Sequence, residues 1–502
     1  MAKGKYLLTL DAGTGAGRCV IFDLSGAQVT RAYREWSYFS LEGLSGAWEF
    51  SPHEFWSILV SLVREALSAS GIDAGDIAAV ACTSQRQGLV LLGQDGRELK
   101  GIPNSDRRAP VEGRALGSEW GKLFYGTAGR WPNDLHPASK LLWLKKNEPR
   151  TWEKVSTVLT MSDWMNFRLS GEMAAEPTGA AETCFMDVCV PEWWAGFTST
   201  LGLPPGSLPP LRRAGDILGG VTAAVAADSG LKEGLPVIVA GADTQCGSLG
   251  AGAVDPGQVA VIAGTSTPVH LVTASAVFDL LGRTLTNCHL IHGRWILESN
   301  ALITGQTYRW LRDLCFRDEA PGVAFEVMDR EAAMVPPGSA GVQAFAGASI
   351  MDSTRGSFLP RGGIMFPLPL SQGTGRGALA RGLLESYAFA VRANLEQLSE
   401  ISGMKFERVL GGGQGTSSRL WTEIVASVTG LPVLVPRVKE TTALGAAMCA
   451  AAGIGACGSL TQAAKEMGVC EDRIDPESQL GGFYEEAYQE WVKTYARLKE
   501  VR

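Results

Sequence analysis

Residues 7–23 and residues 257–273 share one pattern, in which a short apolar strand, a turn containing Gly-Thr and a second strand follow one another. The repeat predicts two halves of similar architecture, each opening with a hairpin. A chain of 502 residues also exceeds what a single hydrophobic core usually supports. We therefore predict one domain over residues 1–252 and a second over residues 253–502, which would face each other and place both turns in one cleft.

Strand and helix patterns alternate along the chain, which is typical of an α/β protein. The Gly-, Ser- and Pro-rich stretch 336–375 is read as a long insertion or an irregular strand region, and no order is assigned to it. The periodicity predicts strands at 7–10, 19–23, 77–82, 89–92 and 237–240, and helices at 52–68, 140–146, 382–403, 417–430 and 483–498.

Composition excludes several classes of function. A net charge of −7 and a pI near 5.5 give no basic surface of the kind that attracts nucleic acid. No apolar run approaches the ~18 residues of a membrane span, and the N-terminus has no signal-peptide pattern. The 10 cysteines form no CxxC pair, which argues against a structural zinc site or disulfides and indicates a cytoplasmic protein with reduced thiols.

The first glycine-rich turn is a candidate phosphate site. Its glycines miss the G-x-G-x-x-G spacing and a strand-like segment follows, and no Walker Gly-Lys-Ser/Thr lies nearby. In the remaining hairpin, backbone N–H groups and the Thr14 hydroxyl would hold phosphate oxygens, Arg18 would add charge, and Asp11 would reach Mg²⁺ through water. The alternative is a tight turn with no ligand.

Two other polar segments lie among apolar ones. The run Ser84-Gln85-Arg86-Gln87 stands between two predicted strands, so it is interpreted as pointing into a cleft that binds a polyhydroxylated ligand, or else as an ordinary polar turn. Asp106 and Arg108 are expected to form a surface ion pair.

Asp243 is the sharpest local signal in the sequence. It follows the strand Val237-Ile238-Val239-Ala240 and Gly241-Ala242, so it is interpreted as a general base for a substrate hydroxyl or, alternatively, as a helix N-cap. Downstream, Gly411–Gly415 precede a helix, where glycines would let a flat ring approach the backbone, or else form a flexible connector. The small-residue helix predicted at 438–455 is assigned to the core without chemistry.

In this order along the chain, the segments resemble the FGGY family of carbohydrate kinases, whose members have an actin-like, ribonuclease H-like ATPase fold with a central nucleotide cleft. The match spans nearly the whole sequence. It rests on the motifs "DAGTGAGR", "SQRQG", "DRR", "HPASKLLWLKKNEP", "SDWMNFRLSGE", "GADTQCGSLGAG", "AGTS", "TGQTYRWLRD", "GGGQGTSSRLW" and "KETTALGAA".

The resemblance implies phosphorylation of a sugar or polyol hydroxyl by ATP with Mg²⁺, and it assigns roles to residues. Asp243 is implied as the base, and Asp11 and Asp243 as the residues beside the metal. The implied sugar-binding residues are Arg86, Gln87, Asn104, Asp243, Thr244 and Gln245. The implied nucleotide-binding residues are Thr14, Gly15, Arg18, Gly264, Thr265, Gly305, Arg309, Gly412, Gly413 and Ser417.

Two departures bear on the substrate. Asn104 stands where the glycerol kinase pattern has tryptophan, and "ALARGLLESYAF" only approximates the second family signature, with Gly382 where alanine or serine is usual. Asn104, "TLDAGTG", the Asp-x-Gln of residues 243–245, "VPPGSAGV" and "TGLPVLVPRVKETTALG" are instead similar to the bacterial autoinducer-2 kinase branch. That branch acts on the open-chain form of a five-carbon signal, and a xylulokinase or other pentulose or polyol kinase is the alternative.

Two hypotheses come from other classes of protein. An actin-like ATPase that moves a protein partner would need a peptide-binding domain, and nothing in the sequence resembles one. A non-catalytic sugar-binding regulator is disfavoured because Asp11 and Asp243 are both present. The expected partner is a small sugar, without nucleic acid or membrane, and a homodimer is one assembly that the resemblance allows.

Overall fold

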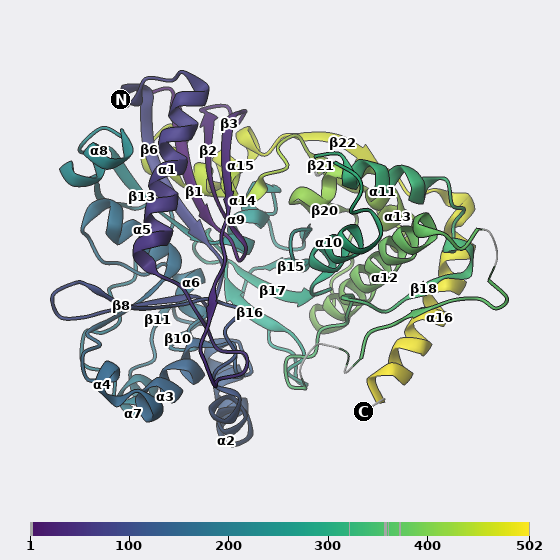
Figure 1. Ribbon diagram of the computed structural model, residues 1–502, viewed down its shortest axis with the longest axis horizontal. Coiled ribbons are helices and arrows are strands. Elements are labelled where there is room, and N and C mark those ends of the chain that lie inside the picture. The colour runs from purple at the N-terminus through teal and green to yellow at the C-terminus, as the bar shows by residue number, and fades with distance from the viewer. Residues whose placement is uncertain (1–3, 321, 356–358, 360, 371–372, 501–502) are drawn as a thin grey trace.

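The computed structural model describes residues 4–320, 322–355, 359, 361–370 and 373–500. Two mixed β-sheets with helices packed against them form the molecule. The first sheet lies on the left of Figure 1 and the second on the right, with the strands of the second sheet reaching toward the first. The α/β class predicted from the alternating pattern is confirmed.

The first sheet has six strands in the order β12-β13-β6-β1-β2-β3. The chain enters as an antiparallel meander, β1 to β3, and then adds β6 and β13 parallel to β1 on its other side. The strands are β1 (Tyr6–Ala12), β2 (Ala16–Asp23), β3 (Gln28–Glu35), β6 (Ile77–Ser84), β12 (Ile217–Gly220) and β13 (Pro236–Ala242).

The second sheet has seven strands in the order β16-β17-β15-β14-β20-β21-β22. Its inner strands repeat the plan of the first sheet, because an antiparallel run of β14, β15 and β17 is followed by β20 and β21 parallel to β14. The strands are β14 (Val259–Ile262), β15 (Pro268–Thr273), β16 (Leu285–Cys288), β17 (Trp295–Asn300), β20 (Val409–Gly412), β21 (Val433–Pro436) and β22 (Cys470–Ile474).

The common topology makes the β1–β2 hairpin the counterpart of the β14–β15 hairpin, as the repeated Gly-Thr pattern predicts. The exact division between residues 252 and 253 stays a prediction. Helix α14 (Thr441–Gly453), from the C-terminal half, packs against β1, β6 and β13 of the first sheet, so the two halves interlock rather than stand apart.

The interlocking depends on a close crossing of α14 with α9 (Asp243–Gly250). A Cβ atom at Gly445 would lie 1.9 Å from the carbonyl oxygen of Cys246, and one at Gly250 would lie 2.0 Å from that of Thr441. Only glycine fits at either position. The small-residue helix expected at 438–455 is thus a packed core element.

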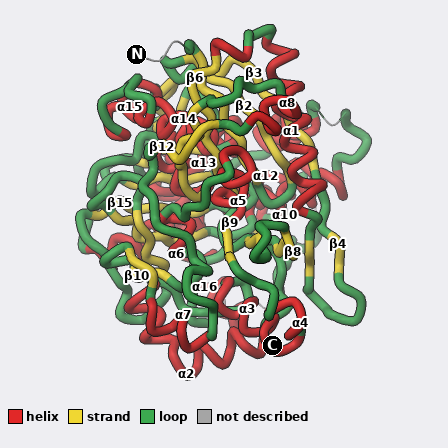
Figure 2. The backbone as a smooth tube through the Cα atoms, turned by 90° about the vertical axis from the view of Figure 1, so that its left-hand side faces the viewer, coloured by secondary structure: helices red, strands yellow, loops and turns green. Residues whose placement is uncertain are grey.

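A separate group of elements forms one end of the molecule, below the first sheet in Figures 1 and 2. It contains a three-stranded sheet in the order β8-β7-β9 and several helices, packed around apolar residues such as Leu91, Phe124 and Trp143. Its elements are β7 (Leu89–Leu92), β8 (Glu98–Ile102), β9 (Thr157–Thr160), α2 (Pro110–Ala128), α3 (Pro137–Asn147), α4 (Pro149–Trp152) and α7 (Ala195–Leu201).

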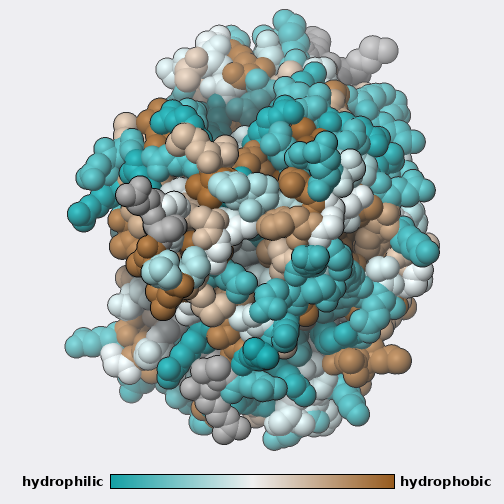
Figure 3. Space-filling model, turned by 90° about the vertical axis from the view of Figure 1, so that its right-hand side faces the viewer, coloured by the Kyte–Doolittle hydropathy of each residue, from teal (hydrophilic) through white to brown (hydrophobic). Residues whose placement is uncertain are grey.

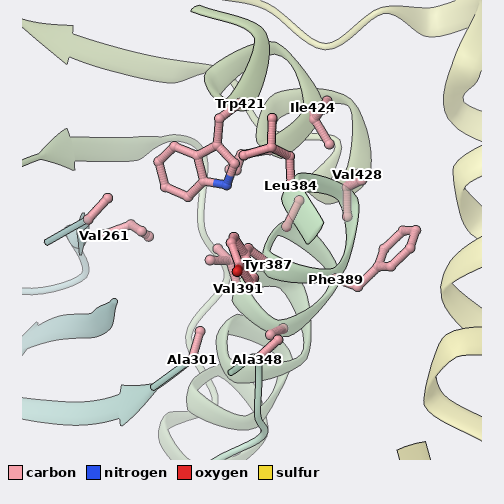
Figure 4. Close-up of a cluster of buried hydrophobic side chains, with 14 of the residues drawn as sticks. Val261, Ala301, Ala348, Leu384, Tyr387, Phe389, Val391, Trp421, Ile424 and Val428 are labelled. Atoms are coloured by element: carbon pink, nitrogen blue, oxygen red, sulfur yellow. The ribbon is translucent and has the colours of Figure 1, made fainter. Parts of the chain in front are cut away.

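The core of the C-terminal half is built on the 27-residue helix α12 (Arg376–Ser402). Figure 4 shows Leu384, Tyr387 and Val391 from this helix beside Trp421 and Ile424. The helices of this half are α10 (Thr304–Cys315), α11 (Ala324–Ala333), α13 (Arg419–Thr429), α15 (Leu460–Met467) and α16 (Gly481–Glu500).

Two further helices pack on the first sheet: α1 (Pro52–Ser70) lies against β2 and β3, and α5 (Met161–Ser170) packs on β6 and β13. The remaining elements are short or peripheral. They are α6 (Pro177–Ala181), α8 (Ala223–Ser229), β4 (Phe39–Ser40), β5 (Trp48–Glu49), β10 (Met186–Asp187), β11 (Glu192–Trp193), β18 (Gln343–Ala344), β19 (Ile364–Met365) and 3₁₀ turns at Ala74–Asp76, Ser339–Gly341, Gln414–Ser417 and Ser478–Leu480.

All ten predicted elements exist, and most extend a little further than the sequence pattern indicates. The largest shift is at α12, which begins at Arg376 rather than residue 382 because small residues such as Gly377 pack against α11 there. The stretch 336–375 lies partly outside the described residues. Its described part contains only the short strands β18 and β19 and a single 3₁₀ turn.

Hydrophilic residues cover most of the face shown in Figure 3, with hydrophobic residues interspersed. None of the helices that the structure describes has both the length and the apolar character needed to cross a bilayer.

The helix crossing gives a first prediction. Gly445→Ala should destabilise the protein by about 1–3 kcal/mol, since a methyl group must displace the backbone of α9. Gly126→Ala is the matched control, because Gly126 is also helical and has open space around it, so alanine there should stabilise by about 0.5–1 kcal/mol. Urea unfolding measures both. Equal stability of the two variants would refute the close approach.

Candidate active site

Asp11 lies at the carboxyl end of β1 and is buried. Its Oδ2 accepts a hydrogen bond of 3.0 Å from Nη1 of Arg18, across the hairpin. Burial raises the pKa of Asp11 above its usual range, with Glu440 adding to this effect and Arg18 opposing it. The second oxygen, Oδ1, is buried without a hydrogen-bond partner among the described residues, so it can accept from a water molecule bound to a cation.

The turn after Asp11 is held from behind by aromatic side chains. The carbonyl of Thr14 accepts hydrogen bonds from Tyr38 and from Nε1 of Trp36, and Trp36 N donates to the carbonyl of Gly15. The Thr14 hydroxyl accepts from Nδ2 of Asn104 at 2.9 Å. These hydrogen bonds hold the turn more firmly than an unsupported hairpin turn would be held.

The second hairpin turn is joined to helix α10. Nη2 of Arg309 donates to the Thr265 hydroxyl at 3.0 Å, and a Cβ atom at Gly305 would lie 2.0 Å from the carbonyl oxygen of Gly264. The structure therefore brings together Gly264, Thr265, Gly305 and Arg309, as the sequence predicts.

The glycine-rich segment after β20 lies against the same turn. Gly412 O accepts from Ala263 N at 2.7 Å, Gly415 N donates to Ala263 O at 2.9 Å, and Gly413 N donates to the Thr441 hydroxyl at 2.9 Å. Gly413 has a φ of +79°, which favours glycine. The segment is packed in place and runs into a 3₁₀ turn that ends at Ser417, so the alternative of a flexible connector is wrong.

Asp243 is the first residue of α9, directly after β13, and it is partly exposed. The registers pair Asp11 with Thr83 and Ala242 with Ser84, so Asp11 and Asp243 lie at one edge of the first sheet on either side of β6. Burial raises the pKa of Asp243 to about 7, with Asp11 contributing and Arg86 opposing. Among the described residues, its Oδ1 accepts only from the adjacent Thr244 N, at 2.8 Å, and the N-cap is Ala242, so the N-cap alternative is wrong.

Arg86 links the two halves of the molecule. Its guanidinium forms two hydrogen bonds with Glu298 on β17, of 2.6 and 3.0 Å, and a third of 3.3 Å with Glu182. Burial alone would raise the pKa of Glu298, but Arg86 and His270 hold it well below its usual range. A buried arginine clamped in this way is rigid and keeps its charge.

Glu182 extends the same network. It accepts from Nε and Nη2 of Arg130 at 3.2 and 2.5 Å, from Nδ2 of Asn287 at 3.1 Å and from Nε2 of Gln87 at 3.1 Å. Gln87 adopts a left-handed φ of +64°, which is uncommon for a residue with a side chain. Arg86 and Gln87 are therefore held by buried carboxylates, whereas Gln85 donates to the Tyr38 hydroxyl and the Ser84 hydroxyl donates to the neighbouring Gln85 carbonyl.

The other residues predicted to bind the sugar are Thr244, Gln245 and Asn104. Thr244 donates its hydroxyl proton to Oε1 of Gln245 at 2.8 Å. Nε2 of Gln245 and Oδ1 of Asn104 are buried and have no hydrogen-bond partner within the described chain. Both side chains thus retain an unused polar atom.

The predicted surface pair of Asp106 and Arg108 is wrong, because both side chains are fully buried. Nε of Arg108 contacts both Asp106 oxygens at 3.0 Å, and its Nη1 donates to Glu49 at 3.0 Å. The pair anchors residues 48–49, since Trp48 N donates to Asp106 and Arg108 donates to the Trp48 carbonyl. A spacing of two residues carries no information on burial, so the sequence could not distinguish a surface ion pair from a buried one.

Sequence reasoning missed Glu182, Glu298 and Lys140, which support the predicted residues. A usable signal existed for Glu298, since it is a carboxylate within the otherwise strand-like segment Trp295–Asn300. For Glu182 and Lys140 no local pattern separates a buried charge from a solvated one.

The strand end that carries Asp243 is fixed by a buried carboxyl group. Oε2 of Glu176 accepts hydrogen bonds from the backbone N and hydroxyl of Thr178, and the same hydroxyl oxygen accepts from Ala242 N at 2.9 Å. Burial raises the pKa of Glu176 to about 8. Glu176 therefore positions the backbone immediately before Asp243.

Within the described ranges, no three His, Cys, Asp or Glu side chains gather as a protein-only metal site. A metal at Asp11 would consequently depend on water or a bound phosphate for its other ligands, which is the usual mode of Mg²⁺ at phosphate-transfer sites.

Family profiles match both halves of the chain. The N-terminal domain of the FGGY family of carbohydrate kinases matches residues 6–250, and the C-terminal domain of the same family matches residues 259–454. The autoinducer-2 kinases of Klebsiella pneumoniae and Salmonella typhimurium are 34% and 33% identical to the chain, each over 98% of this chain and 94% of the relative.

Solved structures agree with these matches. The xylulose kinase of Rhodospirillum rubrum superposes with a TM-score of 0.82 at 27% identity, covering 98% of this chain and 99% of that one. The glycerol kinase of Plasmodium falciparum with ADP shares the fold, with a TM-score of 0.83 at 19% identity over 99% and 98% of the two chains. The predicted actin-like ATPase fold is confirmed.

The Glu176 contact gives a second prediction. Because the pKa of Glu176 is raised to about 8 in the folded protein, the stability that it contributes at low pH is lost as the pH rises through that value. Glu176→Gln should remove this dependence. Between pH 5 and pH 8 the free energy of unfolding of the wild type should therefore fall by up to about 1.4 kcal/mol per pH unit relative to that of the variant. Urea unfolding at several pH values measures the difference, and a constant difference would contradict the assignment.

Proposed function

Because the chain belongs to the FGGY family of carbohydrate kinases and is therefore an ATP-dependent sugar kinase, we propose that its substrate is an open-chain five-carbon sugar derivative of the autoinducer-2 type. The observation that carries the phosphoryl-transfer part of this proposal is Asp243, a partly exposed carboxylate with a pKa of about 7 that lies beside Arg86 and Asp11. Two features support the expected cytoplasmic location. ATP is the phosphate donor, and all 10 cysteines are free thiols.

The substrate class is supported by the relatives. Autoinducer-2 kinases are 33–34% identical over nearly the whole chain, whereas the xylulose kinase of Rhodospirillum rubrum is 27% identical. The unpaired Oδ1 of Asn104 and Nε2 of Gln245 agree with this choice. An open-chain sugar offers a hydroxyl donor for the first and a carbonyl acceptor for the second, and buried polar atoms usually find such partners.

We place the phosphates of ATP between the two hairpin turns. Thr14, Gly15 and Arg18 would hold them on one side, and Gly264 and Thr265 on the other. The nucleoside would lie along Gly305, Arg309, Gly412, Gly413 and Ser417, and the contacts of Ala263 with Gly412 and Gly415 support this arrangement. Asp11, through its unpaired Oδ1, and Asp243, at the start of α9, would hold Mg²⁺, which would neutralise charge that develops on the phosphates.

The sugar would lie against Arg86, Gln87, Asn104, Thr244 and Gln245, with the reacting hydroxyl toward Asp243. Asp243 accepts the hydroxyl proton as the sugar oxygen bonds to the γ-phosphorus. The bond from that phosphorus to the bridging oxygen breaks, and ADP leaves with the electron pair. A carboxylate with a pKa of about 7 suits this role near neutral pH.

The general base is tested by Asp243→Asn, which keeps the size of the side chain and its acceptor for Thr244 N. We expect kcat to fall by about 10²-fold or more while the protein stays folded. Asp255→Asn, at a part-exposed ion pair with Arg294, is the matched control. Near-wild-type kcat in folded Asp243→Asn would remove Asp243 from the role.

The substrate is tested by a coupled assay of ADP release with the autoinducer-2 precursor, D-xylulose, other pentuloses and glycerol. We expect kcat/KM for the autoinducer-2 precursor to exceed that for D-xylulose by at least tenfold. A higher value for D-xylulose would instead assign a xylulokinase. Turnover without sugar would indicate an actin-like ATPase, and silence with every sugar a non-catalytic regulator.

A further inference from the structure

Lys140 is a fully buried lysine in helix α3 that the proposed reaction does not use. Its Nζ donates to the backbone carbonyl of Pro103 at 2.9 Å and to that of Gln87 at 3.2 Å. In the described part of the chain it forms no ion pair. Burial of an ammonium group against two neutral acceptors is costly, so its presence among Leu141, Trp143 and Leu144 calls for a role beyond packing.

Burial lowers the pKa of Lys140 to about 7, with Asp106 opposing this effect and Arg108 adding to it. A leucine or methionine would fill the same volume without any such penalty. What only a lysine supplies here is a compact head with several donors, which can reach two carbonyls at once.

The two carbonyls belong to the two segments assigned to the sugar. Gln87 is held in a left-handed conformation, next to Arg86. Pro103 directly precedes Asn104, whose backbone N donates to Oε1 of Gln85 at 3.3 Å and whose side chain donates to Thr14. Lys140 is thus the point at which the 84–87 segment and the 103–104 segment are tied to one another and to α3.

We propose that Lys140 is a positioning residue for the sugar site, which fixes the carbonyls of Gln87 and Pro103 and thereby the distance between the side chains that contact the sugar. The inference rests on the proposed placement of the sugar on Arg86, Gln87 and Asn104. Loss of the Lys140 contacts displaces the sugar, whereas the nucleoside contacts, which lie on α10 and in the segment 412–417, are left in place.

Lys140→Met and Lys140→Arg test the proposal, with Lys145→Met as the matched control. Lys145 is on the same helix and also donates to a backbone carbonyl, that of Leu201 at 2.7 Å, but that carbonyl belongs to α7, outside the proposed site. With the best sugar of the wild type, both Lys140 variants should raise the sugar KM at least tenfold and leave the ATP KM within twofold. The control should leave both constants within twofold.

An unchanged sugar KM in a folded Lys140 variant, or equal increases in the sugar and ATP KM values, would overturn the proposal. If Lys140→Met does not fold, Lys140→Arg is judged by the same criterion, since it keeps the charge but replaces the compact head by a planar fork.

Gln87→Ala separates this inference from the proposed function. A raised sugar KM in Gln87→Ala together with a normal one in Lys140→Arg would refute the positioning role and leave the sugar site in place. An unchanged sugar KM in Gln87→Ala would refute the placement of the sugar, and the role of Lys140 with it.

Discussion

The close crossing of α9 and α14 is the constraint on which the arrangement of the site depends. Gly445 contacts the carbonyl of Cys246, and the backbones of the two helices can approach this closely only because one of them lacks a side chain there. The crossing holds α14 against the first sheet, and it holds the first residues of α9 at the carboxyl ends of that sheet's parallel strands. Asp243 is the first residue of α9, so the position of the proposed general base is a consequence of helix packing.

A second tie between the halves is ionic. Arg130, Glu182 and Glu298 are buried and Arg86 is half-buried beside them, and each charge has an opposite partner within hydrogen-bond distance. Removing one partner of such a set leaves an uncompensated buried charge, which typically costs about 3–5 kcal/mol. The same contacts leave Nε of Arg86 without a hydrogen-bond partner in the described chain, so this arginine can serve both the interface and a ligand.

Local sequence signals were sufficient for the elements and for much of the site. The Gly-Thr turns, the aspartates at the ends of β1 and β13 and the glycines after β20 all stand at strand ends, and a strand is a local pattern of apolar residues. The sequence also indicated that the two turns belong together, because they repeat. What it could not show is which distant charges meet, since Arg86 and Glu298 are 212 residues apart. Burial of Asp106, Arg108 and Lys140 likewise depends on tertiary packing.

The two ends of the proposed cleft differ in what holds the ligand. The nucleotide side is built from glycines and the backbone of two hairpins, where Gly305 and Gly413 leave no room for a side chain. The proposed sugar side is built from the side chains of Gln87, Asn104 and Gln245. The buried Glu182 accepts from Gln87, and the half-buried Thr14 accepts from Asn104. A substitution of Gln87 or Gln245 would change which hydroxyls find partners without touching the turn that faces the phosphates, whereas Asn104 is bonded to Thr14 of that turn. Under the proposed placement, substrate choice at Gln87 and Gln245 is therefore separable from phosphoryl transfer, and it depends on a few side chains together with the buried groups that fix them.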